Sequence, residues 1–142
     1  MAFTGNWACN SFKTGVMNAS FNFTSGTFYI ALYTNTATLD ATTTAYTTVG
    51  EVSGTGYTAP GNVLTITQVP TTGTTGNTAY ISFANPAWTA ASFTARGALI
   101  YKAGANGAIC VLDFGADKTA SNNTFTVVMP SVTNTSAIIR LE

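Results

Sequence analysis

The chain has 142 residues, with five Lys+Arg, five Asp+Glu and no histidine, and 7% of its residues are charged, against about 25% in an ordinary soluble domain. This length predicts a single domain, 1–142, that buries about 68–70% of its unfolded surface. A net charge of zero excludes a nucleic-acid binder that works by neutralising phosphates, and the lack of histidine removes the usual general acid–base and the commonest metal ligand.

The N-terminal region predicts one short helix and no membrane segment. Residues 1–10 lack the basic and apolar regions of a signal peptide, and the longest apolar runs hold about five residues, where a membrane helix needs about 20. We therefore expect a protein made in the cytoplasm, with no membrane partner. Residues 10–17 predict the helix, because Phe12 and Val16 stand four residues apart and Asn10 can act as a cap, although Gly15 weakens it.

Strand patterns dominate the rest of the chain. Alternating or doubly apolar segments predict strands at residues 27–34, 62–68, 78–83, 88–94, 124–129 and 136–141. The Thr/Ala/Gly-rich stretch 35–61 predicts a long connection, with room for a helical turn near 38–45, and residues 71–77 predict a loop.

A hairpin is predicted at residues 97–114, where two apolar runs flank Asn106-Gly107, the preferred central pair of a type I′ turn. In that register Ala105 faces Ala108. Tyr101 then lies opposite Leu112, and Leu99 lies opposite Phe114. One face of the hairpin would carry Leu99, Tyr101, Cys110, Leu112 and Phe114.

About seven short strands separated by turn signals predict an all-β fold. We expect an antiparallel β-sandwich, jelly-roll-like, with at most one short N-terminal helix. A parallel α/β sheet is excluded because the chain has no crossover helices.

Few side chains could carry chemistry. Asp113 and Asp117 flank Gly115 and could share a calcium site, but simple pairing with Lys102 or Lys118 is favoured, so neither a metal nor a cofactor is predicted. The two cysteines stand outside any CxxC pair, which favours two reduced structural thiols, Cys9 and Cys110, over one disulfide.

No enzyme is predicted. A serine or cysteine nucleophile would lack a histidine base, and the Gly-rich residues 50–57 have neither the strand-to-helix context nor the lysine of a phosphate loop. Exposed aromatic side chains could stack on sugar rings, although core packing explains most of them; the candidates are Trp7, Trp88, Tyr29, Tyr33 and Tyr46.

The composition favours a protein that is a component of a multi-copy assembly. Uncharged Thr, Ser and Asn surfaces can be buried without removing charges from water. Neutral net charge also provides no long-range repulsion against association.

Five segments, in the same order and over nearly the whole chain, carry a resemblance to a known family: MAFTGNWACNSFK, FYIALYTNTATLDATTTAY, GEVSGTGYTAPG, WTAASFTARGALIY and VLDFGADKT. They resemble small virion structural proteins of tailed bacteriophages. The resemblance implies a non-enzymatic head component located in the virion. It implies a capsid cement (decoration) protein on the outer surface that bridges subunits of an HK97-like major capsid protein, as a dimer or trimer. It supplies no catalytic residues.

The candidate partner contacts are five aromatic side chains: Phe3, Trp7, Phe12, Tyr46 and Tyr57. Residues 1–10 are expected to form an arm that reaches a partner, because Phe3 and Trp7 lie in a segment too short and polar to form its own core. The connection 35–61 is a second candidate contact. The alternative functions are a tail, neck or head-fibre component of the virion, and a carbohydrate-binding adhesin module.

Overall fold

The computed structural model describes residues 3–142, which form eight strands and one helix. In chain order these are β1 (Trp7–Ala8), α1 (Asn10–Met17), β2 (Phe28–Tyr33), β3 (Asn62–Leu64), β4 (Ile66–Thr72), β5 (Ala79–Phe83), β6 (Ala87–Tyr101), β7 (Ala108–Thr126) and β8 (Ile139–Leu141). The predicted helix at 10–17 is confirmed.

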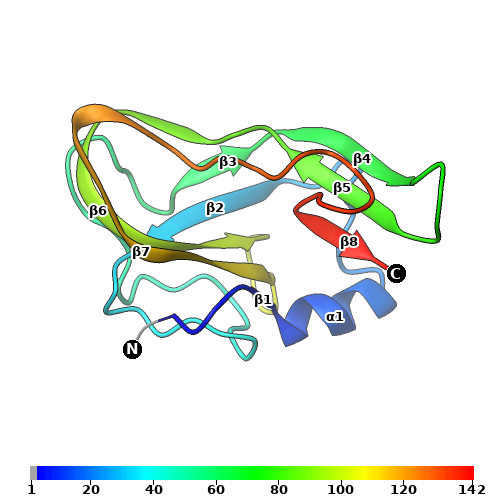
Figure 1. Ribbon diagram of the computed structural model, residues 1–142. Helices are drawn as coiled ribbons and strands as arrows, with labels where there is room; N and C mark the ends of the chain where they lie inside the picture. The colour runs from blue at the N-terminus through cyan, green and yellow to red at the C-terminus, as the bar shows by residue number, and fades with distance from the viewer. Residues whose placement is uncertain (1–2) are drawn as a thin grey trace.

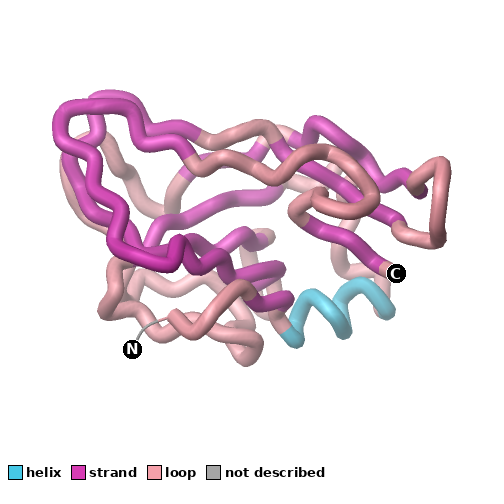
Figure 2. The backbone as a smooth tube through the Cα atoms, in the orientation of Figure 1, coloured by secondary structure: helices cyan, strands magenta, loops and turns pink. Residues whose placement is uncertain are grey.

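The strands form two antiparallel sheets, one in the order β1-β7-β6-β2-β3 and the other in the order β4-β5-β8. In Figure 1 the β6–β7 hairpin runs along the lower layer, bends upward at one end of the molecule and returns in the upper layer. Figure 2 shows strand segments in both layers and the single helix below them. The predicted antiparallel β-sandwich with one short N-terminal helix is confirmed; jelly-roll connectivity stays a prediction.

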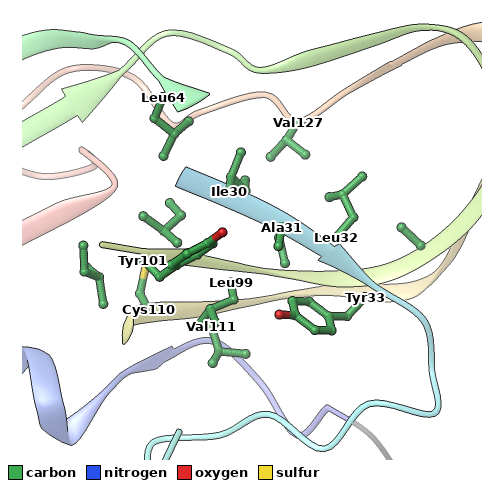
Figure 3. Packing of buried hydrophobic residues seen from close by; sticks show 14 of the residues in the cluster. Ile30, Ala31, Leu32, Tyr33, Leu64, Leu99, Tyr101, Cys110, Val111 and Val127 are labelled. Atoms are coloured by element: carbon green, nitrogen blue, oxygen red, sulfur yellow. The ribbon is translucent and has the colours of Figure 1, made fainter. Parts of the chain in front are cut away.

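The core is centred on β2, whose residues are buried on both faces. β2 pairs with β6 on one side and, at Phe28–Ile30, with β3 on the other, and five of its six residues are buried. Figure 3 shows Ile30 and Leu32 of β2 pointing toward Leu64 and Val127, whereas Leu99 of β6 and Val111 of β7 lie on the other face of the sheet. The strands predicted at 27–34 and 78–83 are confirmed as β2 and β5.

Other predicted strands differ in extent. Residues 62–68 divide into β3 and β4, because the chain leaves one sheet at Thr65 and enters the other. Residues 88–94 are part of the much longer β6. The pairing of β7 stops at Thr126, although Val127 and Met129 remain buried, and the last strand is shortened to β8. Residues 38–45 contain no helical turn; Asp40 instead accepts the Thr42 N–H at 2.7 Å in a local turn.

The predicted register of the β6–β7 hairpin is wrong. Leu99 pairs with Val111, and Ala98 pairs with Leu112. Leu99 therefore lies on the face opposite Leu112. Near the turn, residues 97–101 and 108–111 are buried on both faces of the hairpin, so hydrophobic alternation could not distinguish the two registers.

The turn of the hairpin explains the shift. Residues 102–107 form the connection, closed by the Lys102 N–H, which donates to the Gly107 carbonyl at 2.8 Å. Asn106 does adopt positive φ, at 57°, but Gly104 does so as well, at 104°, and the turn is longer than a two-residue type I′ turn. A favourable Asn-Gly pair thus marks the turn without fixing its length.

A bulge in β7 bends the hairpin from one layer to the next. Gly97 pairs with Asp113 while Ala95 pairs with Lys118, so residues 114–117 stand opposite Arg96 alone. The Asp113 carboxylate contacts Arg96 Nε at 3.2 Å and accepts the N–H of Gly115, whose φ of +76° favours glycine.

The expected pairing of Asp113 or Asp117 with lysine is therefore wrong. Asp113 pairs with Arg96, and Asp117 accepts a hydrogen bond from Asn35 Nδ2 at 3.1 Å. The bulge causes the difference, because it leaves Arg96 next to the Gly97–Asp113 pair, where its guanidinium group contacts the Asp113 carboxylate.

Residues 3–8, which we call the strap, pack along the domain's own sheet, and Phe3 joins its core. The Phe3 ring is 1% exposed and lies over Gly97, where any side chain would collide with it. The strap therefore packs on the chain's own sheet through Phe3, whereas contact of the expected arm 1–10 with a partner stays a prediction, and Met1 and Ala2 lie outside the described residues. The strap packs there because a glycine in β6 leaves room for the ring and because β7 offers the strap a free edge.

Truncation of Phe3 tests this packing. We expect Phe3→Ala to lower the free energy of unfolding by about 3–5 kcal/mol, because it empties a filled core position. Val128→Ala, at a side chain that is 74% exposed, is the control and is expected to change stability by no more than about 0.5 kcal/mol. Urea unfolding measures both, and equal midpoints for the two variants would contradict the assignment.

Candidate interaction site

Two places collect the side chains singled out in the sequence: a tyrosine cluster around Glu51 and a groove between the edges of the two sheets. In the described part of the chain, 3–142, no group of three or more metal-ligating side chains comes together. Nor does any helix there have the length and apolar character needed to cross a membrane.

The tyrosine cluster holds a carboxylate within the fold by hydrogen bonds. Tyr46 Oη donates to Glu51 Oε2 at 2.5 Å, and Tyr57 Oη donates to Glu51 Oε1 at 2.6 Å. The Tyr57 hydroxyl also accepts the Leu32 N–H of β2 at 3.1 Å. Each carboxylate oxygen thus has a hydroxyl partner, and the connection 35–61 is tied to the central strand.

Glycines let this part of the connection approach β6 closely. Gly56, with φ of +84°, lies against the backbone of Ala91, and a Cβ there would collide with it. The Tyr57 ring packs on Trp88 and Phe93 at centroid distances of 6.1 and 5.8 Å. The structural interpretation of residues 50–57 agrees with these contacts.

Burial raises the pKa of the tyrosines in this region. Partial burial, followed by the hydrogen bond to Glu51, raises the pKa of Tyr46 to about 12. Burial is also the main cause that raises the pKa of Tyr33, Tyr57 and Tyr101 above the ordinary value of 10. The hydroxyls therefore stay protonated and available as donors throughout the neutral range.

The groove lies where the two sheets leave their edges unpaired. β1 is the edge of the five-stranded sheet and β8 the edge of the three-stranded sheet, and α1 lies beside both (Figure 1). The hollow between them measures about 790 Å³ and is lined mainly by apolar side chains, among them Trp7, Phe12, Val16, Met17, Ile139 and Leu141.

Several groove side chains are exposed to a degree unusual for their size. Met17 is 81% exposed, Leu141 is 48% exposed and Trp7 is 40% exposed. The charged groups at the groove are Lys13, Arg140 and Glu142. A second hollow of about 490 Å³ shares Asn6, Leu112, Pro130 and Ile138 with the first and continues toward Phe125 between the layers.

The structure divides the five predicted contact residues. Trp7 and Phe12 both line the groove, although Phe12 itself is 4% exposed. Phe3, the first residue of the strap, is buried over Gly97, and Tyr46 and Tyr57 bind Glu51 instead. The expectation that Phe3 and Tyr57 offer exposed contact surface is therefore wrong for this chain, because both rings are covered by its own residues.

Other contributions to the groove escaped sequence reasoning. Val16, Met17 and Leu141 belong to segments predicted correctly as helix and strand, but nothing in their spacing shows that they face an open edge. The one available signal in the sequence was the apolar pair Val16-Met17 at the end of the predicted helix, and the structure shows both side chains exposed.

The remaining candidates are used internally. In the connection 35–61, Ala37, Leu39 and Val52 are buried against the chain's own sheet. Trp88 and Tyr33 are buried as well, so of the five aromatics considered for sugar stacking only Trp7 counts as exposed.

Both cysteines are free and buried, and their reduced state in solution stays a prediction. Burial, and then the charge of Asp40, raises the pKa of the Cys9 thiol to about 11. Burial likewise raises the pKa of Cys110 to about 12. Thiols held in the protonated form are poor nucleophiles.

Comparisons with models of protein families, with curated proteins and with solved structures find no match to this chain. The assignment of function therefore depends on the residues and geometry described above.

The tyrosine and cysteine pKa values predict alkaline sensitivity. Because these pKa values are raised in the folded state, the unfolded chain loses protons first, and the free energy of unfolding falls as pH rises above about 9 to 10. Urea unfolding between pH values of about 8 and 11 measures this. A stability that stays constant up to about pH 11 would contradict the prediction.

Tyr57→Phe should lower the free energy of unfolding by about 1–3 kcal/mol at neutral pH, since it leaves Glu51 and the Leu32 N–H with one partner fewer.

Thiol labelling tests the burial of Cys9 and Cys110. At about pH 8 we expect a thiol-specific reagent to leave the folded protein unmodified and to label both thiols once guanidinium chloride has unfolded the chain. Rapid labelling of the folded protein, or no labelling of the unreduced, unfolded chain, would show that the thiols are exposed or joined.

Proposed function

We propose that the protein is a non-enzymatic structural protein of a tailed-bacteriophage particle. Its best-supported role is that of a capsid cement (decoration) protein on the outer head surface, which bridges subunits of an HK97-like major capsid protein and stabilises the shell. Self-association as a dimer or trimer belongs to the same proposal. The observation that carries it is the open apolar groove between two sheet edges, in a chain that has few free charges.

The use of charge within the fold supports a binding role. Arg96 pairs with Asp113, Glu51 is held by two tyrosine hydroxyls, and the Asp40 carboxylate accepts two hydrogen bonds from Thr42. Much of the remaining surface is Thr, Ser and Asn. Such a surface can be covered by a partner without the cost of removing unpaired charges from water.

The groove provides the means of binding. An edge strand presents unpaired N–H and C=O groups, so an extended segment of a partner can add to the sheet at β1 or β8. Exposed Met17, Leu141 and Trp7 then provide apolar contact area beside the backbone pairing. The groove holds no pair of neighbouring carboxylates and no nucleophile with a base, and this favours binding over catalysis.

The alternative within the same particle is a tail, neck or head-fibre component. An apolar groove would suit a structural protein at any of these positions, and the number of copies per particle distinguishes them. The carbohydrate-binding adhesin is less favoured, because Trp7 is the single exposed aromatic among the candidates for sugar stacking and one ring makes no platform.

Quantification of this protein in purified particles tests the proposal. A cement protein is expected in hundreds of copies per particle, whereas about a dozen copies would indicate a neck protein and a few copies a fibre.

Rebinding to shells tests the groove itself. We expect Met17→Asp to reduce occupancy of shells stripped of this protein by at least about tenfold, because it would place an unpaired carboxylate in an apolar contact. Val49→Asp, at a side chain 72% exposed and away from the groove, is the matched control. Equal occupancy for both variants would contradict binding through the groove.

A further inference from the structure

We infer that the strap, residues 3–8, exchanges between copies of this chain: the strap of one copy pairs with β7 of a neighbour, and its Phe3 occupies the neighbour's position over Gly97. This inference concerns a second copy of the chain and does not rest on the proposed place in a phage particle.

The strap is held by a receptor built from a single hairpin. Phe3 lies over Gly97 of β6, and Trp7 and Ala8 pair with Val111 and Cys110 of β7. Asn6 Oδ1 accepts the N–H of Asp113 at 2.7 Å. β6 and β7 pair with each other on both sides of the bulge, so the receptor is in place whichever copy provides the strap.

Nothing in the strap opposes transfer to another copy. Residues 3–8 carry no charged side chain, so their release and rebinding involve no desolvation of charge. Gly5 adopts φ of +137° with open space around its Cα, a conformation that imposes no packing constraint. Both residues of β1 are exposed. The one deeply buried group is the Phe3 ring.

The reach of the strap is sufficient. Residues 3–9, extended in front of α1, span at most about 23–25 Å. A compact domain of this length has a radius of gyration of about 15 Å. A strap released at Cys9 therefore reaches the β7 edge of a neighbour whose surface adjoins its own.

The equilibrium depends on local concentration. The same contacts form in the closed and the exchanged state, so the difference between them is mainly the effective concentration of the strap at its own site, about millimolar for a short tether. In dilute protein, each strap stays paired with β7 of its own copy. Copies packed side by side reach comparable local concentrations and exchange it, which links neighbours without any new contact.

The register of β1 provides a direct test. Ala8 lies opposite Cys110, and opposed residues of an antiparallel pair have Cα atoms about 4.5–5.5 Å apart, within the range of a disulfide. In a Cys9→Ala background, Ala8→Cys should form a disulfide with Cys110 of whichever copy receives the strap. Non-reducing electrophoresis then distinguishes an intrachain bond from an interchain bond.

After unfolding, refolding and oxidation at about micromolar concentration, we expect the intrachain product. At about millimolar concentration, we expect covalent dimers and larger species to reach roughly half of the protein. The matched control adds Cys110→Ser and should give far fewer. An intrachain product alone at every concentration, or equal dimer in the control, would overturn the inference.

A second measurement avoids engineered thiols. Light and isotopically heavy wild-type chains are refolded together at about millimolar concentration, diluted and examined by native mass spectrometry. We expect mixed dimers that dissociate slowly, and a lifetime at least about tenfold shorter for Phe3→Leu, because the smaller side chain fills the position over Gly97 less completely. Monomers alone, or equal lifetimes for the two proteins, would overturn the inference.

Discussion

Backbone pairing along the β6–β7 hairpin is the constraint on which the rest of the structure depends. The hairpin receives β1 on one side and β2 on the other, and it belongs to both layers because the bulge at residues 114–117 bends it. The Arg96–Asp113 contact and the hydrogen bond from Gly115 to Asp113 hold that bend. The strap, the core and the open edge beside the groove all take their positions from this one element.

The few charged side chains of the protein fix parts of this same architecture in place. Glu51 binds two tyrosine hydroxyls and thereby ties the long connection 35–61 to β2. A hydrogen-bonded network of this kind specifies one arrangement of the connection, since each polar atom that lost its partner would be left unsatisfied. The chain therefore uses several of its few charges to fix loops and corners, and leaves an apolar groove and an uncharged surface for partners.

Sequence patterns predicted the type of an element well where the element has the same surroundings along its whole length. The helix at 10–17 and the strand β2 were predicted because their apolar spacing or continuous apolar content is local. The prediction of the hairpin register failed for a physical reason: near the turn both faces of β6 and β7 are buried, so a slip of the register there changes no hydrophobic pattern that a sequence can show. The same applies to Trp7 and Phe3, which are equally apolar in the sequence but 40% and 1% exposed in the fold.

The sequence by itself determined an all-β domain with little charge, no histidine and two structural thiols, because composition and period-two alternation are properties of the chain alone. Only the tertiary structure decided which aromatic side chains face outward, which residues bind the carboxylates of Glu51 and Asp113, and where two sheet edges leave a groove. These depend on contacts between segments far apart in the chain, where a missing side chain at Gly97 or four residues in a bulge determine the outcome.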